Sequence, residues 1–200
     1  MIFASPWPIG LCALILLSLA PAPVSAADAN GQFATKGIGV LSCAVFVEAR
    51  SQGSATASRL KDWLDGYLTA TNRYEPDTFD VAPWGPSEVF AIIIENHCRQ
   101  NPDEGFAQAA QRLVLSIGTD RLARRSPLRT VTANGANTQI YDEVLRRVQA
   151  QLAERGLYNG QPDGVFGPRT RDAIATFQIS EGMDGTGLPD PLTVWKLVRP

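Results

Sequence analysis

The chain has 200 residues, of which 44% are apolar and 19% are charged, and its net charge is −2. This composition predicts a folded protein of one ordinary domain or two small ones, and it excludes a nucleic-acid-binding protein held by a broad basic surface. One histidine and three cysteines are too few for a zinc site built on several histidines, so we expect no metal ion and no cofactor.

Residues 1–26 have the pattern of a secretory signal peptide. They contain no Asp, Glu, Lys or Arg, and their apolar run from Ile9 to Ala20 is shorter than the roughly 20 residues that a membrane-spanning helix needs. The Val24-Ser25-Ala26 segment predicts cleavage after Ala26. We therefore expect an exported protein with no stable membrane span after cleavage, and an uncleaved membrane anchor is the alternative.

Residues 27–117 are predicted to form a helical domain. Apolar side chains crowd every face of residues 40–49, as in a buried helix, whereas those of residues 54–72 follow a single stripe. Residues 73–86 are rich in Pro and Asp and are expected to form a loop.

Two further helices are predicted before residue 118. Pro86 favours the start of one, because proline is pre-set for the first helical turn. The Asn101-Pro102-Asp103-Glu104 segment predicts the start of the next, with Asn101 as its cap, and that helix continues to Ile117.

Two cysteines, Cys43 and Cys98, remain after the predicted cleavage. An even pair in a small exported domain indicates a disulfide. Two buried free thiols are the alternative, because the bridge depends on the predicted export.

Residues 118–137 have the composition of a linker between two domains. They contain glycine and proline and show little hydrophobic periodicity. Four arginines make this segment basic: Arg121, Arg124, Arg125 and Arg129. They could contact an anionic polymer or lipid headgroups, but we favour a solvated linker because four arginines are a small patch.

Residues 138–200 are predicted to form a second domain of three helices. Thr138 would cap the first helix, and Gly156 would end it. Pro168 and Pro191 would each lie in the first turn of a following helix. The predicted fold is therefore all-α, with two small helical domains, the first closed by a disulfide.

The segment QPDGVFGPRTRDAIATFQ predicts a rigid loop at the start of the second of these helices. Gly164 suits a tight turn with positive φ, and the Thr170 hydroxyl can reach the loop backbone. Phe166 and Phe177 can share the core.

Residues 144–198 resemble the peptidoglycan-binding domain found at the ends of many bacterial cell-wall hydrolases. The matching segments are VQAQLAERGLYNG, DGVFGPRTRDAIATFQ and GLPDPLTVWKL. The resemblance implies a three-helix module with a shallow groove that binds the glycan–peptide wall. It places ligand binding near six residues: Asp163, Gly164, Phe166, Gly167, Thr170 and Phe177. The alternative is that most of them shape the loop and that Phe177 belongs to the core.

Residues 37–115 resemble periplasmic helical proteins of the HdeA type and the related Tai-type immunity proteins. The resemblance depends on Cys43, Cys98, the Trp63-Leu64-Asp65-Gly66-Tyr67 stretch and the Asn101-Pro102 dipeptide that follows Cys98. It implies a compact, disulfide-closed domain in the periplasm or cell envelope that interacts with another protein.

The sequence offers little catalytic chemistry. Ser58 and Lys61 match the SxxK pattern of penicillin-binding enzymes, but the accompanying motifs are missing. His97 could pair with Glu95 or Asp103, without a recognisable nucleophile beside it. The candidates for a pair of glycosidase carboxylates are Glu48, Glu88, Glu95 and Glu104. We therefore expect a non-enzymatic protein that binds peptidoglycan and a protein partner; an acid-stress chaperone and a wall hydrolase are the alternatives.

Overall fold

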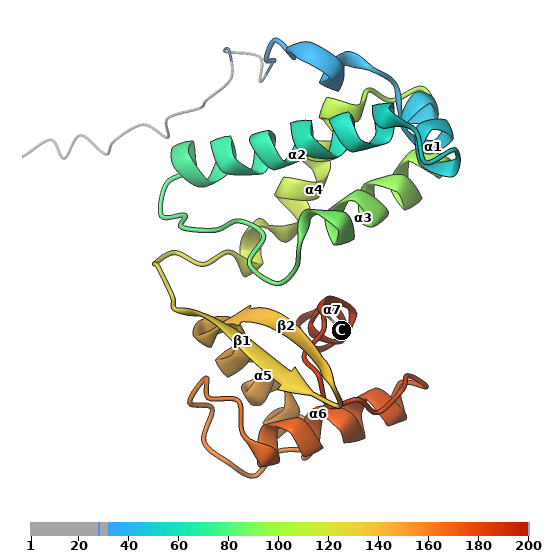
Figure 1. Ribbon diagram of the computed structural model, residues 1–200. Helices are drawn as coiled ribbons and strands as arrows, with labels where there is room; N and C mark the ends of the chain where they lie inside the picture. Colours follow the sequence, from blue (N-terminus) through green and yellow to red (C-terminus); the bar gives the residue numbers. More distant parts are fainter. Residues whose placement is uncertain (1–27, 29–31, 200) are drawn as a thin grey trace, which may run out of the picture. The chain divides into compact units, whose positions relative to one another are not determined.

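The structure of the chain, a computed structural model, describes residue 28 and residues 32–199 (Figure 1). The predicted signal peptide, residues 1–26, lies outside the described residues. None of the helices that the structure describes is long and apolar enough to cross a membrane. Residues 34–200 are assigned to one compact unit.

Four α-helices precede residue 118, as the sequence predicted. A short 3₁₀ turn comes before them, and their bounds are Gly37–Val40 for the turn, Cys43–Ser51 for α1, Ala55–Tyr74 for α2, Ser87–Gln100 for α3 and Phe106–Ile117 for α4. The apolar stripe of α2 is buried through Leu60, Leu64 and Leu68. The rings of Phe46 and Phe106 lie 4.7 Å apart in this core, so α1 and α4 are joined by aromatic packing.

A disulfide joins Cys43 at the first residue of α1 to Cys98 near the end of α3. Both cysteines are fully buried. The predicted pairing is confirmed, and it connects two helices that are far apart in the sequence.

The predicted start of α4 at Asn101 is wrong, because α4 begins at Phe106. The intervening backbone instead serves α1. The Pro102 carbonyl accepts a hydrogen bond from the Ala44 N–H at 2.9 Å, and the Glu104 carbonyl accepts one from the Cys43 N–H at 2.7 Å. Residues that look like a helix cap in the sequence thus satisfy the free N–H groups of another helix.

The predicted all-helical fold is incomplete, because residues 128–141 form a β-hairpin. Strand β1 (Leu128–Ala133) pairs antiparallel with β2 (Ala136–Tyr141). Asn134 and Gly135 form the turn with φ of 49° and 76°. An Asn-Gly pair with two positive φ angles is the favoured two-residue hairpin turn, so the composition read as a linker was a turn signal.

The C-terminal part contains three helices, as predicted. They are α5 (Asp142–Glu154), α6 (Pro168–Ser180) and α7 (Pro191–Val198). Thr138 does not cap α5, because it lies inside β2, and α5 begins only at Asp142. The first turns of α6 and α7 contain the predicted prolines, and Gly156 follows α5 with φ of 73°.

The core of α1–α4 continues into the C-terminal helices. The Trp84 ring lies 4.8 Å from the Trp195 ring of α7, and the Phe79 ring lies 6.1 Å from the Tyr141 ring at the end of β2. The Asp120 carboxylate accepts a hydrogen bond from the Arg199 guanidinium. These contacts make the intervening residues part of a packed structure, whereas the sequence predicted a separate linker.

Candidate functional site

The loop between α5 and α6, residues 155–167 (the first loop), is organised by the buried side chain of Gln149. Its Nε2 amide lies 2.9 Å from Asp163 Oδ1, 3.1 Å from the Val165 carbonyl oxygen and 3.1 Å from Thr170 Oγ1. Its Oε1 atom accepts a hydrogen bond from the Gly164 N–H at 2.7 Å. A fully buried amide is costly unless its polar atoms are paired, so this network fixes the loop in one conformation.

Gly164 is required at the centre of this network. Its φ is 76°, and a Cβ atom there would lie 2.5 Å from the backbone carbonyl oxygen of Asp142. The predicted positive φ is therefore confirmed, and the close approach of α5 adds a second reason for glycine.

The loop between α6 and α7, residues 181–190 (the second loop), repeats this arrangement. Gln178 of α6 accepts a hydrogen bond from the Gly187 N–H at 2.7 Å, and its Nε2 amide lies 3.0 Å from the Leu188 carbonyl oxygen and 2.9 Å from Thr193 Oγ1. Gly187 has φ of 70°. The α6 helix thus ends one glutamine-centred loop and begins the next.

The six predicted ligand-binding residues differ in what they expose. Asp163 is exposed, Phe166 and Gly167 are half-buried, and Gly164 and Thr170 are buried beneath them. Phe177 is only 3% exposed and packs in the core. The structure gathers the first five around the first loop, and their contact with a ligand stays a prediction.

The carboxyl group of Asp163 has a pKa below its ordinary value. The main cause is a hydrogen bond from the Val165 N–H, and a second hydrogen bond comes from Gln149. These hydrogen bonds favour the ionised form of Asp163, which presents a negative charge on the first loop.

Sequence reasoning missed two features of this loop. Gln149 carries the network, and the signal was a neutral polar residue on the apolar stripe of α5, four residues after Leu145 and three before Leu152. Val165 is 64% exposed at the tip of the loop, next to Asp163. An apolar side chain held outward by a rigid loop is a natural contact for a ligand.

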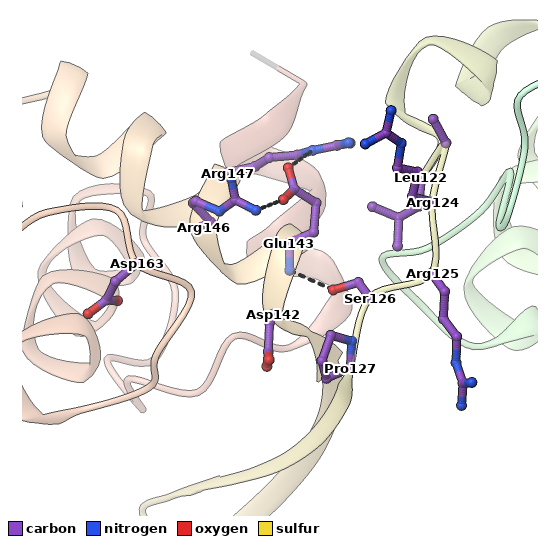
Figure 2. A pocket seen from close by; sticks show the side chains of 11 residues that line it. Leu122, Arg124, Arg125, Ser126, Pro127, Asp142, Glu143, Arg146, Arg147 and Asp163 are labelled. Carbon is purple, nitrogen blue, oxygen red and sulfur yellow. Dashed lines mark hydrogen bonds and ion pairs between the residues drawn. The ribbon is translucent and has the colours of Figure 1, made fainter.

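A pocket of about 480 Å³ lies beside the first loop (Figure 2). Its lining includes Asp163 of that loop, the first turns of α5 and residues 122–127. The Ser126 hydroxyl accepts a hydrogen bond from the Glu143 N–H at 3.0 Å, and the Pro127 carbonyl accepts one from the Asp142 N–H at 2.9 Å. These bonds fasten the segment before the hairpin to the start of α5.

The candidate carboxylates of α3, Glu88 and Glu95, are engaged in ion pairs. Arg50 contacts Glu88 at 2.8 Å and Glu95 at 2.5 Å, and Glu95 also pairs with Arg99. Burial raises the pKa of Glu95, but the hydrogen bonds from the two arginines outweigh it, so its pKa lies below the ordinary value. A glycosidase general acid needs a raised pKa, so this environment is unsuited to that role.

His97 pairs with Glu104, whereas the sequence suggested Glu95 or Asp103. The distance from Nε2 to Oε2 is 2.5 Å, and Arg112 contacts the other oxygen of Glu104 at 2.7 Å. Burial raises the pKa of Glu104, but these two hydrogen bonds outweigh it and the pKa is lowered. The arrangement joins the end of α3 to α4.

The SxxK match lies on the surface of α2, where Lys61 pairs with Asp65 at 3.2 Å. This lysine is therefore engaged by a carboxylate one helical turn away. Within the described residues, no group of three or more His, Cys, Asp and Glu side chains could hold a metal ion.

Residues 141–197 match the model of a protein family described as "Putative peptidoglycan binding domain". This match confirms the resemblance that the sequence predicted for residues 144–198. It covers the two glutamine-centred loops and all three C-terminal helices, but not the residues 122–127 that line the pocket.

Two curated proteins resemble short stretches of the chain. It is 51% identical over 45 residues to "Putative OxPP cycle protein OpcA" of Synechococcus elongatus, which is 22% of this chain and 10% of that protein. It is 46% identical over 52 residues to "Spore cortex-lytic enzyme" of Oceanobacillus iheyensis, which is 26% of this chain and 19% of that enzyme. The chain thus spans less than a fifth of the length of either relative. No solved structure gives a significant match.

Proposed function

We propose that the chain binds peptidoglycan through the first loop and presents α1–α4 to a protein partner at the cell wall. The observation that carries the proposal is the Gln149 network, because it fixes an exposed loop tip within the segment that matches a peptidoglycan-binding family. The contact residues in this proposal are Asp163, Val165 and Phe166, and the buried Gly164 and Thr170 keep the loop in shape.

The proposal includes export to the periplasm or cell envelope. It is supported by the pattern of residues 1–26 and by the family match, since a wall ligand lies outside the cytoplasm. A disulfide between α1 and α3 suits an oxidising compartment. The protein would act by tethering, which raises the concentration of α1–α4 at the wall.

Wall hydrolysis by this chain is not part of the proposal. The likeness to the spore cortex-lytic enzyme extends over 19% of that enzyme, so its activity does not transfer to this chain. The lowered pKa values of Glu95 and Glu104 also disfavour these two residues as general acids.

The test is sedimentation of the chain from Ala27 with purified peptidoglycan sacculi. The variant Val165→Ser removes an exposed apolar side chain and keeps the backbone groups through which Val165 joins the Gln149 network. The matched control is Leu115→Ser on α4, where the side chain is 74% exposed. We expect the parent and the control to sediment equally and Val165→Ser to bind about three- to tenfold more weakly, as for the loss of one apolar contact.

Two outcomes would contradict the proposal. If the parent chain stays in the supernatant, the C-terminal module is not a wall-binding module in this protein. If Val165→Ser and Leu115→Ser bind equally well, the first loop is not the contact surface.

A further inference from the structure

The pocket beside the first loop carries more positive than negative charge. Arg124, Arg125, Arg146 and Arg147 line it together with three carboxylates, and we call it the arginine pocket. Arg129 stands just outside the lining and contacts Asp142 at 3.2 Å. Five arginines and three carboxylates therefore lie in this part of the molecule.

The carboxylates of the arginine pocket already have partners. Asp142 pairs with Arg129, and Glu143 pairs with both Arg146 and Arg147. The Asp163 carboxylate accepts hydrogen bonds from Gln149 and from the Val165 N–H. A further anion entering the pocket would therefore meet acidic groups whose charge is partly matched.

Arg147 is held in place as one wall of the pocket. Its Nη1 group donates a hydrogen bond to the Asp120 carbonyl at 2.5 Å, and its Nη2 group donates one to the Arg121 carbonyl at 3.2 Å. Its Nε group faces Glu143 at 3.4 Å. A cation anchored by three neighbours provides a preorganised positive charge.

Arg124 is one of two arginines of the pocket, with Arg125, that have no charge partner among the described residues. It is exposed, and no ion pair or hydrogen bond engages it among the described residues. Figure 2 shows its side chain turned toward Arg147, whereas that of the neighbouring Arg125 extends away from α5. Two guanidinium groups that face one another repel, and an anion between them relieves that repulsion.

We propose that the arginine pocket binds a free carboxylate of the peptide stems of peptidoglycan, with Arg124 as its main contact. Guanidinium groups match carboxylates in shape and charge, and the stems carry such groups beside each glycan strand. Asp163 lines both the pocket and the first loop, so one wall fragment can reach both. This inference rests on the proposed function and assigns a role to residues that precede the family match.

The test compares binding of the whole chain to intact sacculi and to sacculi whose free carboxylates have been converted to amides. Arg124→Gln is the variant, and two exposed arginines serve as controls: Arg125→Gln, its neighbour turned away from α5, and Arg59→Gln on α2. Circular dichroism confirms that each variant is folded.

We expect amidation to weaken binding of the parent chain about fivefold, the size of one partly exposed charge pair. Arg124→Gln should lose the same factor on intact sacculi and show no further loss on amidated sacculi. Arg59→Gln should match the parent, and Arg125→Gln should lose less than twofold.

Three results would overturn the inference while leaving wall binding intact. They are equal binding of intact and amidated sacculi by the parent chain, an unchanged affinity in Arg124→Gln, and equal losses in Arg124→Gln and Arg125→Gln, which would indicate a diffuse charge effect. A parent chain that binds neither preparation refutes the proposed function and this inference together.

Discussion

The first and second loops are built on one plan, and they differ in what they present. In both, a buried glutamine accepts a hydrogen bond from a glycine N–H with positive φ and donates to a threonine in the next helix. In the first loop the residue after the glycine is Val165, which is 64% exposed, and in the second it is Leu188, which is 7% exposed. The same hydrogen-bonded plan therefore points one side chain outward and the other into the core.

The ends of the two loops show the same contrast. The second loop ends at Asp190, whose carboxylate caps α7 by accepting hydrogen bonds from the Leu192 and Thr193 N–H groups at 3.0 Å. The first loop ends at Gly167, which offers no side-chain cap to α6. The acidic residue of the first loop, Asp163, is exposed and caps none of the helices that the structure describes. Asp190 of the second loop thus caps the following helix, whereas Asp163 of the first loop is exposed and lines the arginine pocket.

The largest loss of stability is expected when either of the two buried glutamines is replaced. Gln149→Ala and Gln178→Ala each leave a buried glycine N–H without its partner and remove one of the hydrogen bonds of a buried threonine hydroxyl. We expect each to lower the free energy of unfolding by about 2–4 kcal/mol. Urea denaturation followed by circular dichroism measures the loss, with Gln108→Ala on the exposed face of α4 as the control.

These two variants should then differ in function. Gln149→Ala should weaken binding to sacculi under conditions where it remains folded, and Gln178→Ala should bind as the parent does. A loss of stability below about 1 kcal/mol in either variant would show that its network is dispensable.

A second comparison concerns the two glycines. Alanine at Gly164 would place Cβ 2.5 Å from the Asp142 carbonyl oxygen, and alanine at Gly187 would place it 2.8 Å from the Arg171 carbonyl oxygen. We expect each to cost about 2–3 kcal/mol of stability, since a backbone clash adds to the left-handed conformation.

Gly182→Ala is the matched control for the two glycines. Its φ is 70°, but nothing lies within 4 Å of the added Cβ. It should cost about 1 kcal/mol, the conformational part alone. Equal losses at Gly182 and Gly164 would mean that the close approach to α5 contributes nothing.

The smallest expected effect is one of pH on the first loop. The pKa of Asp163 is lower in the folded protein than its ordinary value. Its stabilising contribution is therefore complete above the unfolded pKa of about 3.9 and is lost as the pH falls through the folded pKa. The second loop has Thr186 at the corresponding position, and that side chain does not titrate in this range.

Hydrogen exchange of two amides can detect this difference. The protection of the Gly164 N–H should fall relative to that of the Gly187 N–H as the pH drops below about 4. Asp163→Asn should abolish the relative change. If the ratio of the two stays constant with pH in the parent chain, the carboxylate does not support the Gln149 network.

The sequence predicted most of the helices because their signals are local, and it predicted the disulfide because two cysteines remain after the predicted cleavage. The stripe of Leu60, Leu64 and Leu68 and the prolines at the starts of α6 and α7 each act within a few residues of their own positions. The predicted start of α4 failed because the carbonyls of Pro102 and Glu104 bind the start of α1, far away in the sequence. A capping pattern indicates that a segment can bind the free N–H groups at the start of a helix, but it does not indicate which helix.

The candidate site was predicted in part. The sequence identified the first loop and the need for Gly164. It did not identify Gln149, whose partners lie 9 to 21 positions further along the chain. The arginine pocket was beyond reach, because it depends on the hairpin that brings residues 122–127 against the first turn of α5. Two of its arginines, Arg124 and Arg125, had been interpreted as part of a solvated linker.

The contacts that surround Asp120 have a mechanical consequence. Arg199 at the end of α7 binds the Asp120 side chain, and Arg147 of α5 binds its carbonyl. If the first loop is bound to the wall and a force pulls on α1–α4, that force acts on these hydrogen bonds and on the Trp84–Trp195 contact as well as on the backbone. The segment between α1–α4 and the C-terminal helices would therefore extend only after these contacts break. A flexible linker would extend under a small force, without breaking any contact.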